Sequence, residues 1–137
     1  RMSRGLGDVY KRQHIARAAL EGIAYQVKDL LDAMESDAGE NLSVLRVDGG
    51  ASVNNFLLQF QSDLLRKPID RPQMVETTAF GAAFLAGLAT GVWSSVDEIK
   101  KLRKSDRIFE PVMDESDAEK LHATWLRAVE RSANWEE

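Results

Sequence analysis

The sequence contains no cysteine among its 137 residues, and only two histidines and three prolines. Without cysteine it can form no disulfide framework, thiolate metal site or thiol nucleophile. No uninterrupted apolar run approaches the ~20 residues that a helix needs to cross a bilayer, and no signal peptide is recognisable, so we expect a cytoplasmic protein without a membrane partner. Acidic residues outnumber basic ones, 22 against 18, and the signs are interspersed. This balance argues against nucleic acid as a partner.

Five segments have the spacing of helices. The longest runs from His14 to about Asp37 and stops at Gly39, a natural C-cap. Its expected apolar face consists of Ile15, Ala18, Ala19, Gly22, Ile23, Leu30, Leu31 and Met34. The other four are expected over 52–66, from Thr77 or Thr78 to Gly91, over 96–102, and from Asp114 to about Ala133.

Short β-rich or extended runs separate these helices, at 42–47, around Ile69, and at 107–111. Strands that alternate with helices favour parallel pairing in an α/β domain. Two or three short strands are too few for a complete parallel sheet, which needs both faces covered. We therefore expect part of a larger α/β domain, helix-rich with a short, mostly parallel sheet, whose remaining strands precede residue 14.

The segment most informative about function is VLRVDGGASVNNF, residues 44–56. A β-run leads into Gly49 and Gly50, which allow another group close to the backbone, and a polar residue then begins a helix. In open α/β sheets, ligands bind outside the carboxyl ends of the strands, where this turn would lie. Asn54 could offer a donor and an acceptor to a ring edge. The local pattern leaves open a nucleotide-contacting turn and a plain βα connection, because it matches neither the P-loop nor the GxGxxG spacing.

Other candidate residues favour structural roles. We interpret Glu76 as part of a helix cap rather than a general acid or base, and Gly81 and Gly87 as sites of close helix packing. Neither His14 nor His122 has an obvious nucleophile and carboxylate partner, so no Ser-His-Asp set is expected.

Four segments resemble, in order, the C-terminal part of the glycerol kinases, a branch of the FGGY carbohydrate kinase family. They are HIARAALEGIAYQVKDLLDAM, LRVDGGASVNNFLLQFQSDLL, ETTAFGAAFLAGLATGVW and FEPVMDESDAEKLHATWLRAVERSANWEE. The resemblance covers residues 14–137 without gaps. It implies the C-terminal part of a ribonuclease-H-like domain of the actin/Hsp70-like ATPase superfamily.

By resemblance, the GG turn is the family's adenosine-binding motif. Gly49 would shape the turn, Gly50 would let the nucleotide approach the backbone, and Asn54 would contact the adenine side. The implied reaction is transfer of the ATP γ-phosphoryl group to glycerol, giving glycerol 3-phosphate, with Mg²⁺. The family's catalytic aspartate and its glycerol-binding residues precede this region, so no catalytic or metal-binding residue is assigned here. Family members are commonly dimers or tetramers, so a homo-oligomer is expected of the complete enzyme.

The first 13 residues depart from the family pattern. They are rich in cations and read GDVYKRQ where the family has a Thr/Gly-rich nucleotide-contacting stretch. We therefore expect 1–13 to be a non-native or altered start and 14–137 to be a partial nucleotide-binding domain, inactive alone. Two alternatives stay open, namely another FGGY sugar or polyol kinase and a non-catalytic interaction module that has kept the fold.

Overall fold

The structure, a computed structural model, describes residues 11–133 and contains every helix and extended segment expected from the sequence. The elements are α1 (Arg12–Ala38), β1 (Leu45–Arg46), the 3₁₀ turn η1 (Gly50–Val53), α2 (Asn55–Leu65), β2 (Ile69–Pro72), α3 (Thr77–Thr90), α4 (Val96–Lys100), β3 (Ser105–Phe109) and α5 (Glu115–Ser132). Residues 1–10, to which most of the expectation about an altered start applies, lie outside the described residues. Within the described part of the chain, no helix is long and apolar enough to cross a membrane.

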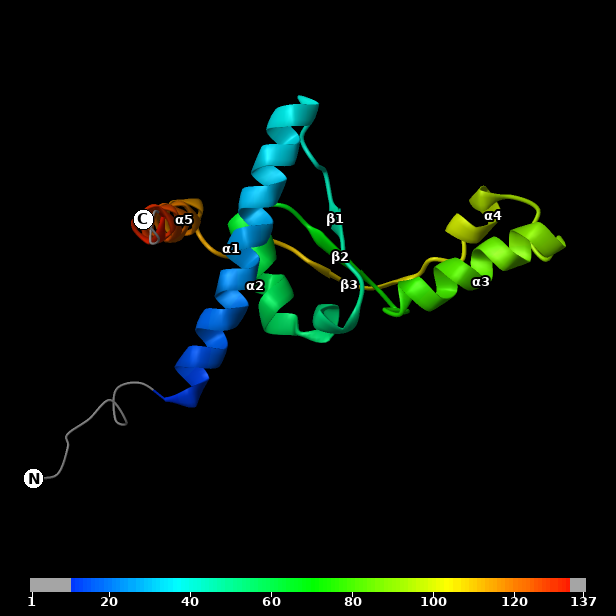
Figure 1. The fold of residues 1–137 in the computed structure, drawn as a ribbon, viewed down its shortest axis with the longest axis horizontal. Helices are drawn as coiled ribbons and strands as arrows, with labels where there is room; N and C mark the ends of the chain where they lie inside the picture. The colour runs from blue at the N-terminus through cyan, green and yellow to red at the C-terminus, as the bar shows by residue number, and fades with distance from the viewer. Residues whose placement is uncertain (1–10, 134–137) are drawn as a thin grey trace, which may run out of the picture.

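The long helix α1 ends as its sequence predicts. Gly39 takes the left-handed conformation, with φ 67°, and its N–H donates to the carbonyl oxygen of Glu35 at 2.9 Å. Residues with a side chain disfavour this φ, so glycine at position 39 is well suited to end the helix. Figure 1 shows α1 running between α5 and the sheet, and the helix packs against α2.

The predicted apolar face of α1 is wrong in this structure. The core side of the helix is formed by Ala24, Tyr25 and Leu31, and only Leu31 belongs to the predicted set. Among the predicted residues, Ile15 is 72% exposed and Leu30 is 61% exposed. Helical spacing identified an apolar stripe, but the described partners of α1 approach it from a neighbouring side.

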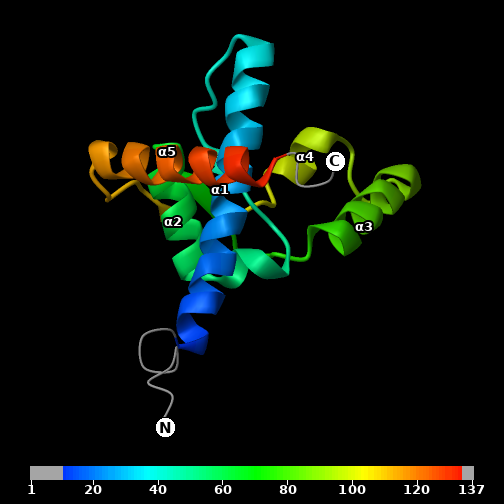
Figure 2. The same ribbon diagram turned by 60° about the vertical axis from the view of Figure 1, so that its left-hand side comes forward.

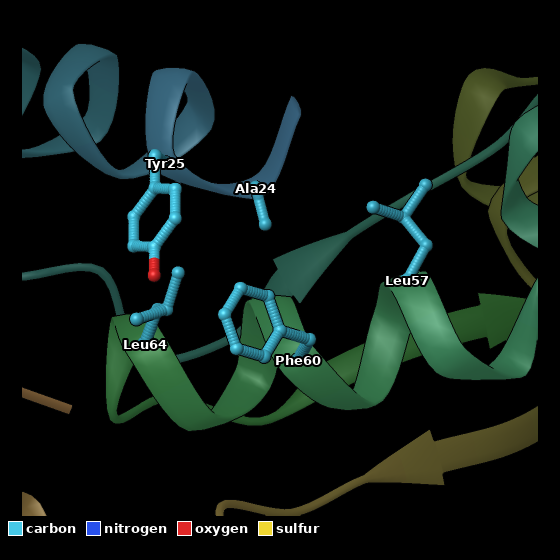
Figure 3. Packing of buried hydrophobic residues seen from close by; sticks show 5 residues of the cluster. All are labelled: Ala24, Tyr25, Leu57, Phe60 and Leu64. Atoms are coloured by element: carbon cyan, nitrogen blue, oxygen red, sulfur yellow. The ribbon is translucent and has the colours of Figure 1, made fainter. Parts of the chain in front are cut away.

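Helix α2 lies at the centre of the molecule and separates two apolar clusters. The first joins α1 to α2 and is shown in Figure 3; its buried members are Ala24, Tyr25, Leu57, Phe60 and Leu64. The second joins both helices to the sheet; its buried members are Leu31, Leu58, Leu65, Ile69 and Phe109. An eleven-residue helix with apolar contacts on two sides holds α1 and the sheet together.

The polar side of α2 is also buried, which its sequence pattern does not predict. Ser62 is fully buried, with Oγ 2.9 Å from the carbonyl oxygens of both Lys67 and Phe109. The Asp63 carboxylate accepts the backbone N–H groups of Val112, at 2.7 Å, and Met113. These side chains anchor the segment after β3, so their burial is offset by hydrogen bonds.

The sheet has three strands in the order β1-β2-β3. Strands β1 and β2 are parallel, with Leu45 opposite Ile69, as the alternation of strands and helices predicts. Strand β3 runs antiparallel to β2, with Phe109 opposite Ile69. The sheet is therefore mixed, with its longer pairing antiparallel, rather than mostly parallel.

Helices α3 and α4 form an arm that projects from the rest of the molecule (Figures 1 and 2). Its own core is the contact between Phe84 and Trp93, whose ring centroids are 5.2 Å apart. Gly87 packs directly on the Trp93 ring, as close helix packing predicts, whereas a Cβ at Gly81 would meet no atom within 4 Å. Leu85 on α3 is 70% exposed. The packing role predicted for Gly81 is therefore not fulfilled by the described residues.

Helix α5 crosses α1 (Figure 2) and is fixed there by one carboxylate. Asp29 of α1 lies 2.8 Å from Nε2 of His122 and accepts the indole N–H of Trp125 at 2.7 Å. His122 therefore has a carboxylate partner that the sequence did not reveal. The His122–Asp29 pair joins two helices, and the second partner of the Asp29 carboxylate is the Trp125 indole rather than a nucleophile.

Candidate functional site

The GG turn follows the carboxyl end of β1, where the sequence places it. Gly49 has φ 79° and ψ 173°, a conformation that side chains disfavour. Its N–H donates to the carbonyl oxygen of Val75 at 2.8 Å, and its carbonyl oxygen accepts both the N–H and the hydroxyl of Ser52. The conformation of Gly49 therefore turns the chain from the sheet into η1.

Gly50 is exposed, and the space beside its Cα is open. A Cβ built on Gly50 would meet no atom within 4 Å, and Gly50 is not among the residues with positive φ. The fold itself therefore does not require glycine at this position. A group outside the described chain has room to contact this stretch of backbone.

Asn54 is half-buried and is the N-cap of α2. Its Oδ1 accepts the N–H of Leu57 at 3.1 Å, as expected for asparagine at this position. The cap occupies Oδ1, so the Nδ2 amide group is the part of the side chain that can donate to a ligand. Gly50 begins η1 and Asn54 directly follows its last residue, so the two lie at opposite ends of one short turn.

Two further residues fix the turn, and sequence reasoning did not assign them to the site. The hydroxyl of Thr77, at the start of α3, donates to Asp48 Oδ2 directly before the glycines. Arg71 of β2 donates to Asn55 Oδ1 at 2.8 Å and to the carbonyl oxygen of Ser52 at 3.2 Å. These contacts join residues 16 to 29 positions apart, so no local sequence signal could have revealed them.

An open cavity of about 770 Å³ begins beside Asp48 and Thr77 and extends between the sheet and the α3–α4 arm. Its apolar walls include Phe80, Phe84, Trp93 and Val96. Its basic side chains are those of Arg46, Lys100, Arg103 and Lys104.

The remaining candidates have no catalytic arrangement. Glu76 occupies the N-cap position of α3, as expected for part of a helix cap, but it does so through its backbone, because its side chain makes no capping hydrogen bond. Within residues 11–133, no group of three or more His, Asp or Glu side chains could hold a metal ion.

Comparison with known proteins defines the family. A family model described as the C-terminal domain of the FGGY family of carbohydrate kinases matches residues 1–90. The chain belongs to the FGGY carbohydrate kinases. The matched part of this FGGY chain contains α1, the GG turn, α2 and α3.

Glycerol kinases are among the similar relatives of this FGGY chain. The glycerol kinase of Caldanaerobacter subterraneus subsp. tengcongensis is 58% identical over 133 residues, which are 97% of this chain and 27% of that protein. The glycerol kinase of Pseudomonas syringae pv. tomato is 58% identical over 132 residues, or 96% of this chain and 26% of that protein. The chain thus spans about a quarter of the length of these relatives.

Solved structures confirm the fold class of the FGGY chain. Plasmodium falciparum glycerol kinase with ADP superposes with a TM-score of 0.79 at 42% identity, covering 96% of this chain and 26% of that one. Xylulose kinase from Lactobacillus acidophilus has a TM-score of 0.71 at 23% identity, covering 96% of this chain and 27% of that one, a likeness of fold alone. The expected partial actin/Hsp70-like domain is therefore confirmed.

Proposed function

We propose that this chain is the ATP-binding C-terminal part of a glycerol kinase, which transfers the γ-phosphoryl group of ATP to glycerol and yields glycerol 3-phosphate. The observation that carries the proposal is the open backbone at Gly50, after the carboxyl end of a parallel strand, with Asn54 at the other end of η1 and fixed by its cap hydrogen bond to Leu57. This arrangement lets a flat ring approach the turn and find an amide donor at its edge. Similarity to the glycerol kinase relatives supports glycerol as the acceptor.

Within this proposal, Gly49 shapes the turn, Gly50 lies against the nucleotide and Asn54 donates to its base. None of these residues transfers a proton or a phosphoryl group. In phosphoryl transfer, positioning and charge neutralisation supply most of the catalysis, and this chain contributes positioning. The catalytic base and the glycerol site belong to the part of such a kinase that this chain does not include.

Mg²⁺, the metal ion that the proposed reaction needs, has no ligands assigned among the residues of this chain. Within residues 11–133, no group of three or more His, Asp or Glu side chains is placed to hold a metal ion. We propose that Mg²⁺ enters bound to the ATP phosphates, its usual mode in kinases.

The proposal is tested by titrating the isotope-labelled 137-residue chain with ADP while recording amide chemical shifts. We expect saturable shifts at Gly50 and Asn54 and none at the distant end of α5. A chain that shows no shift at millimolar ADP contradicts the proposed site and favours a non-catalytic interaction module.

A coupled assay tests the kinase part of the proposal. We expect glycerol-dependent ADP release from a complete kinase that carries this segment and none from the 137-residue chain alone. Xylulose or gluconate in place of glycerol is the control acceptor, and faster turnover with either would favour another FGGY kinase. We propose the cytoplasm, which supplies ATP, as the place of action, and a dimer or tetramer as the complete enzyme.

A further inference from the structure

The guanidinium group of Arg71 lies at the junction of the sheet and the GG turn. On one side it donates to Asn55 Oδ1 at 2.8 Å and to the Ser52 carbonyl oxygen at 3.2 Å. On the other side its Nε and Nη2 lie 2.8 and 2.7 Å from the Asp106 carboxylate on β3. Its carbon Cζ is 5.3 Å from the centre of the Phe109 ring. The Arg71 side chain is only 13% exposed, whereas that of Asp106 is 45% exposed, so a largely buried guanidinium group meets partners that lie at the surface.

The turn has few other attachments on this side. Element η1 is a four-residue 3₁₀ turn, and Ser52 is its only buried residue. At its beginning, the turn is joined to the chain before α3 through Gly49 and Val75, and through Asp48 and Thr77. At its end, the hydrogen bonds from Arg71 are the side-chain contacts that join η1 and the first residue of α2 to the sheet. Arg71 therefore fixes the end of the turn that carries Asn54.

We propose that Arg71 is a positioning residue for nucleotide binding, which holds Asn54 and the Gly50 backbone in register with the sheet. This inference rests on the proposed function and extends it to a residue on the neighbouring strand. The planar guanidinium group can bond the turn and Asp106 at the same time, which a lysine ammonium on a flexible stem cannot reproduce. Asp106 orients the guanidinium group and contributes through it.

Arg107 provides a matched control. It lies opposite Arg71 in the β2–β3 register, and its guanidinium carbon is 4.5 Å from the centre of the same Phe109 ring. Its side chain makes none of the contacts with residues 52–55 that Arg71 makes. Loss of Arg107 therefore removes a similar cation–π contact and leaves the turn attached.

The first experiment measures amide hydrogen exchange in the 137-residue chain and in the Arg71→Ala, Arg71→Lys, Asp106→Asn and Arg107→Ala variants. The amides of Ser52 and Asn54 report on η1, because they donate to Gly49 and Ala51. We expect Arg71→Ala to speed the exchange of these two amides about tenfold more than the exchange of the α2 core amides. Arg71→Lys and Asp106→Asn should give a smaller selective acceleration, and Arg107→Ala should give none. Equal acceleration of all amides would mean a general structural role and overturn the proposal.

The second experiment measures ADP affinity of the same variants under conditions in which circular dichroism shows them folded. We expect about tenfold weaker binding for Arg71→Ala, an intermediate loss for Asp106→Asn and unchanged binding for Arg107→Ala. Unaltered affinity in Arg71→Ala overturns the positioning role while leaving the proposed function intact. A wild-type chain that binds no ADP overturns the proposed function, and the exchange data then still decide whether Arg71 fixes the turn. Should Arg71→Ala not fold, the Arg71→Lys and Asp106→Asn variants decide both questions.

Discussion

The indole ring of Trp125 lies nearly parallel to the phenol ring of Tyr25, with ring centroids 5.2 Å apart and planes 10° apart. The same phenol ring meets Phe60 of α2 edge-on, at 5.7 Å and 89°. Tyr25 thus joins three helices, although the sequence pattern did not place it on the apolar face of α1. Stacked and edge-to-face pairs each contribute about 0.5–1.5 kcal/mol beyond the burial of their area.

Trp125 is expected to stabilise the α1–α5 contact in two separable ways. Trp125→Phe keeps an aromatic ring but removes the indole donor to Asp29, and we expect it to lower the free energy of unfolding by about 1–3 kcal/mol. Trp125→Ala removes the ring as well and is expected to cost more. Urea unfolding followed by circular dichroism measures both. Equal losses in the two variants would show that the stacked ring contributes nothing.

Substitutions at the two glycines of the turn should affect different properties: ADP affinity at Gly50 and stability at Gly49. Gly50→Val adds a side chain where the chain is open, so we expect unchanged stability and ADP affinity reduced by about tenfold or more. Gly49→Val places a β-branched residue at φ 79°, so we expect a loss of about 1–3 kcal/mol of stability. Thermal unfolding and ADP titration of both variants give the comparison. If Gly50→Val binds ADP normally, the nucleotide does not lie against Gly50.

Two substitutions of Asn54 separate its cap from its proposed ligand contact. Asn54→Asp keeps an oxygen acceptor for the Leu57 N–H, so we expect stability close to that of the wild type and weaker ADP binding. Asn54→Ala removes the cap and should cost about 0.5–2 kcal/mol of stability in addition. Unfolding and titration curves are recorded for both. Normal ADP binding by Asn54→Asp would refute the role of the Asn54 amide donor.

The stability of the sheet should depend on pH through Asp70. Burial by itself would raise the pKa of the Asp70 carboxyl, but hydrogen bonds from Arg103 and Ser105, together with nearby positive charge, hold this pKa below its ordinary value. Because the pKa is lower in the folded state, the stabilisation is fully present above the unfolded pKa of about 4 and is lost as the pH falls through the folded pKa.

Asp70→Asn tests this dependence. At pH 7 we expect it to lower the free energy of unfolding by about 1–3 kcal/mol, and we expect its difference from the wild type to shrink below about pH 4. Asp97→Asn, which removes an exposed pair with Lys100, is the control and should change stability by less than about 0.5 kcal/mol. Unfolding measured from pH 7 to pH 3 checks both. A difference that stays constant over this range contradicts the assignment.

Much of the fold could be predicted because its signals are local. Gly39 and Gly91 end α1 and α3 in the left-handed conformation, as glycine after a helical pattern indicates. The βα turn with Gly49 and Gly50 lies where the VDGG run predicts it. Backbone conformation at such positions depends on one or two residues, so the sequence alone suffices.

The neighbours of each element were decided only by the tertiary structure. Helical periodicity showed that α1 has an apolar stripe, but whether Ile15 or Tyr25 is buried depends on where α2 and α5 pack. The polar side of α2 gave no sign that Asp63 would be buried, because its partners are the backbone N–H groups of Val112 and Met113, about fifty residues later. Such contacts depend on distances between elements, which periodicity does not encode.

In the candidate site, too, local features could be predicted from the sequence and contacts between elements could not. The sequence by itself determined that a glycine turn leads from a strand into a helix capped by Asn54, and its resemblance indicated which family uses such a turn. Only the tertiary structure showed that Arg71 of β2 bonds this turn. The guanidinium group of Arg71 is paired there with the Asp106 carboxylate of β3. The physical reason is that one residue's φ and one cap hydrogen bond define a turn, whereas its orientation requires side chains that meet only after the sheet has formed.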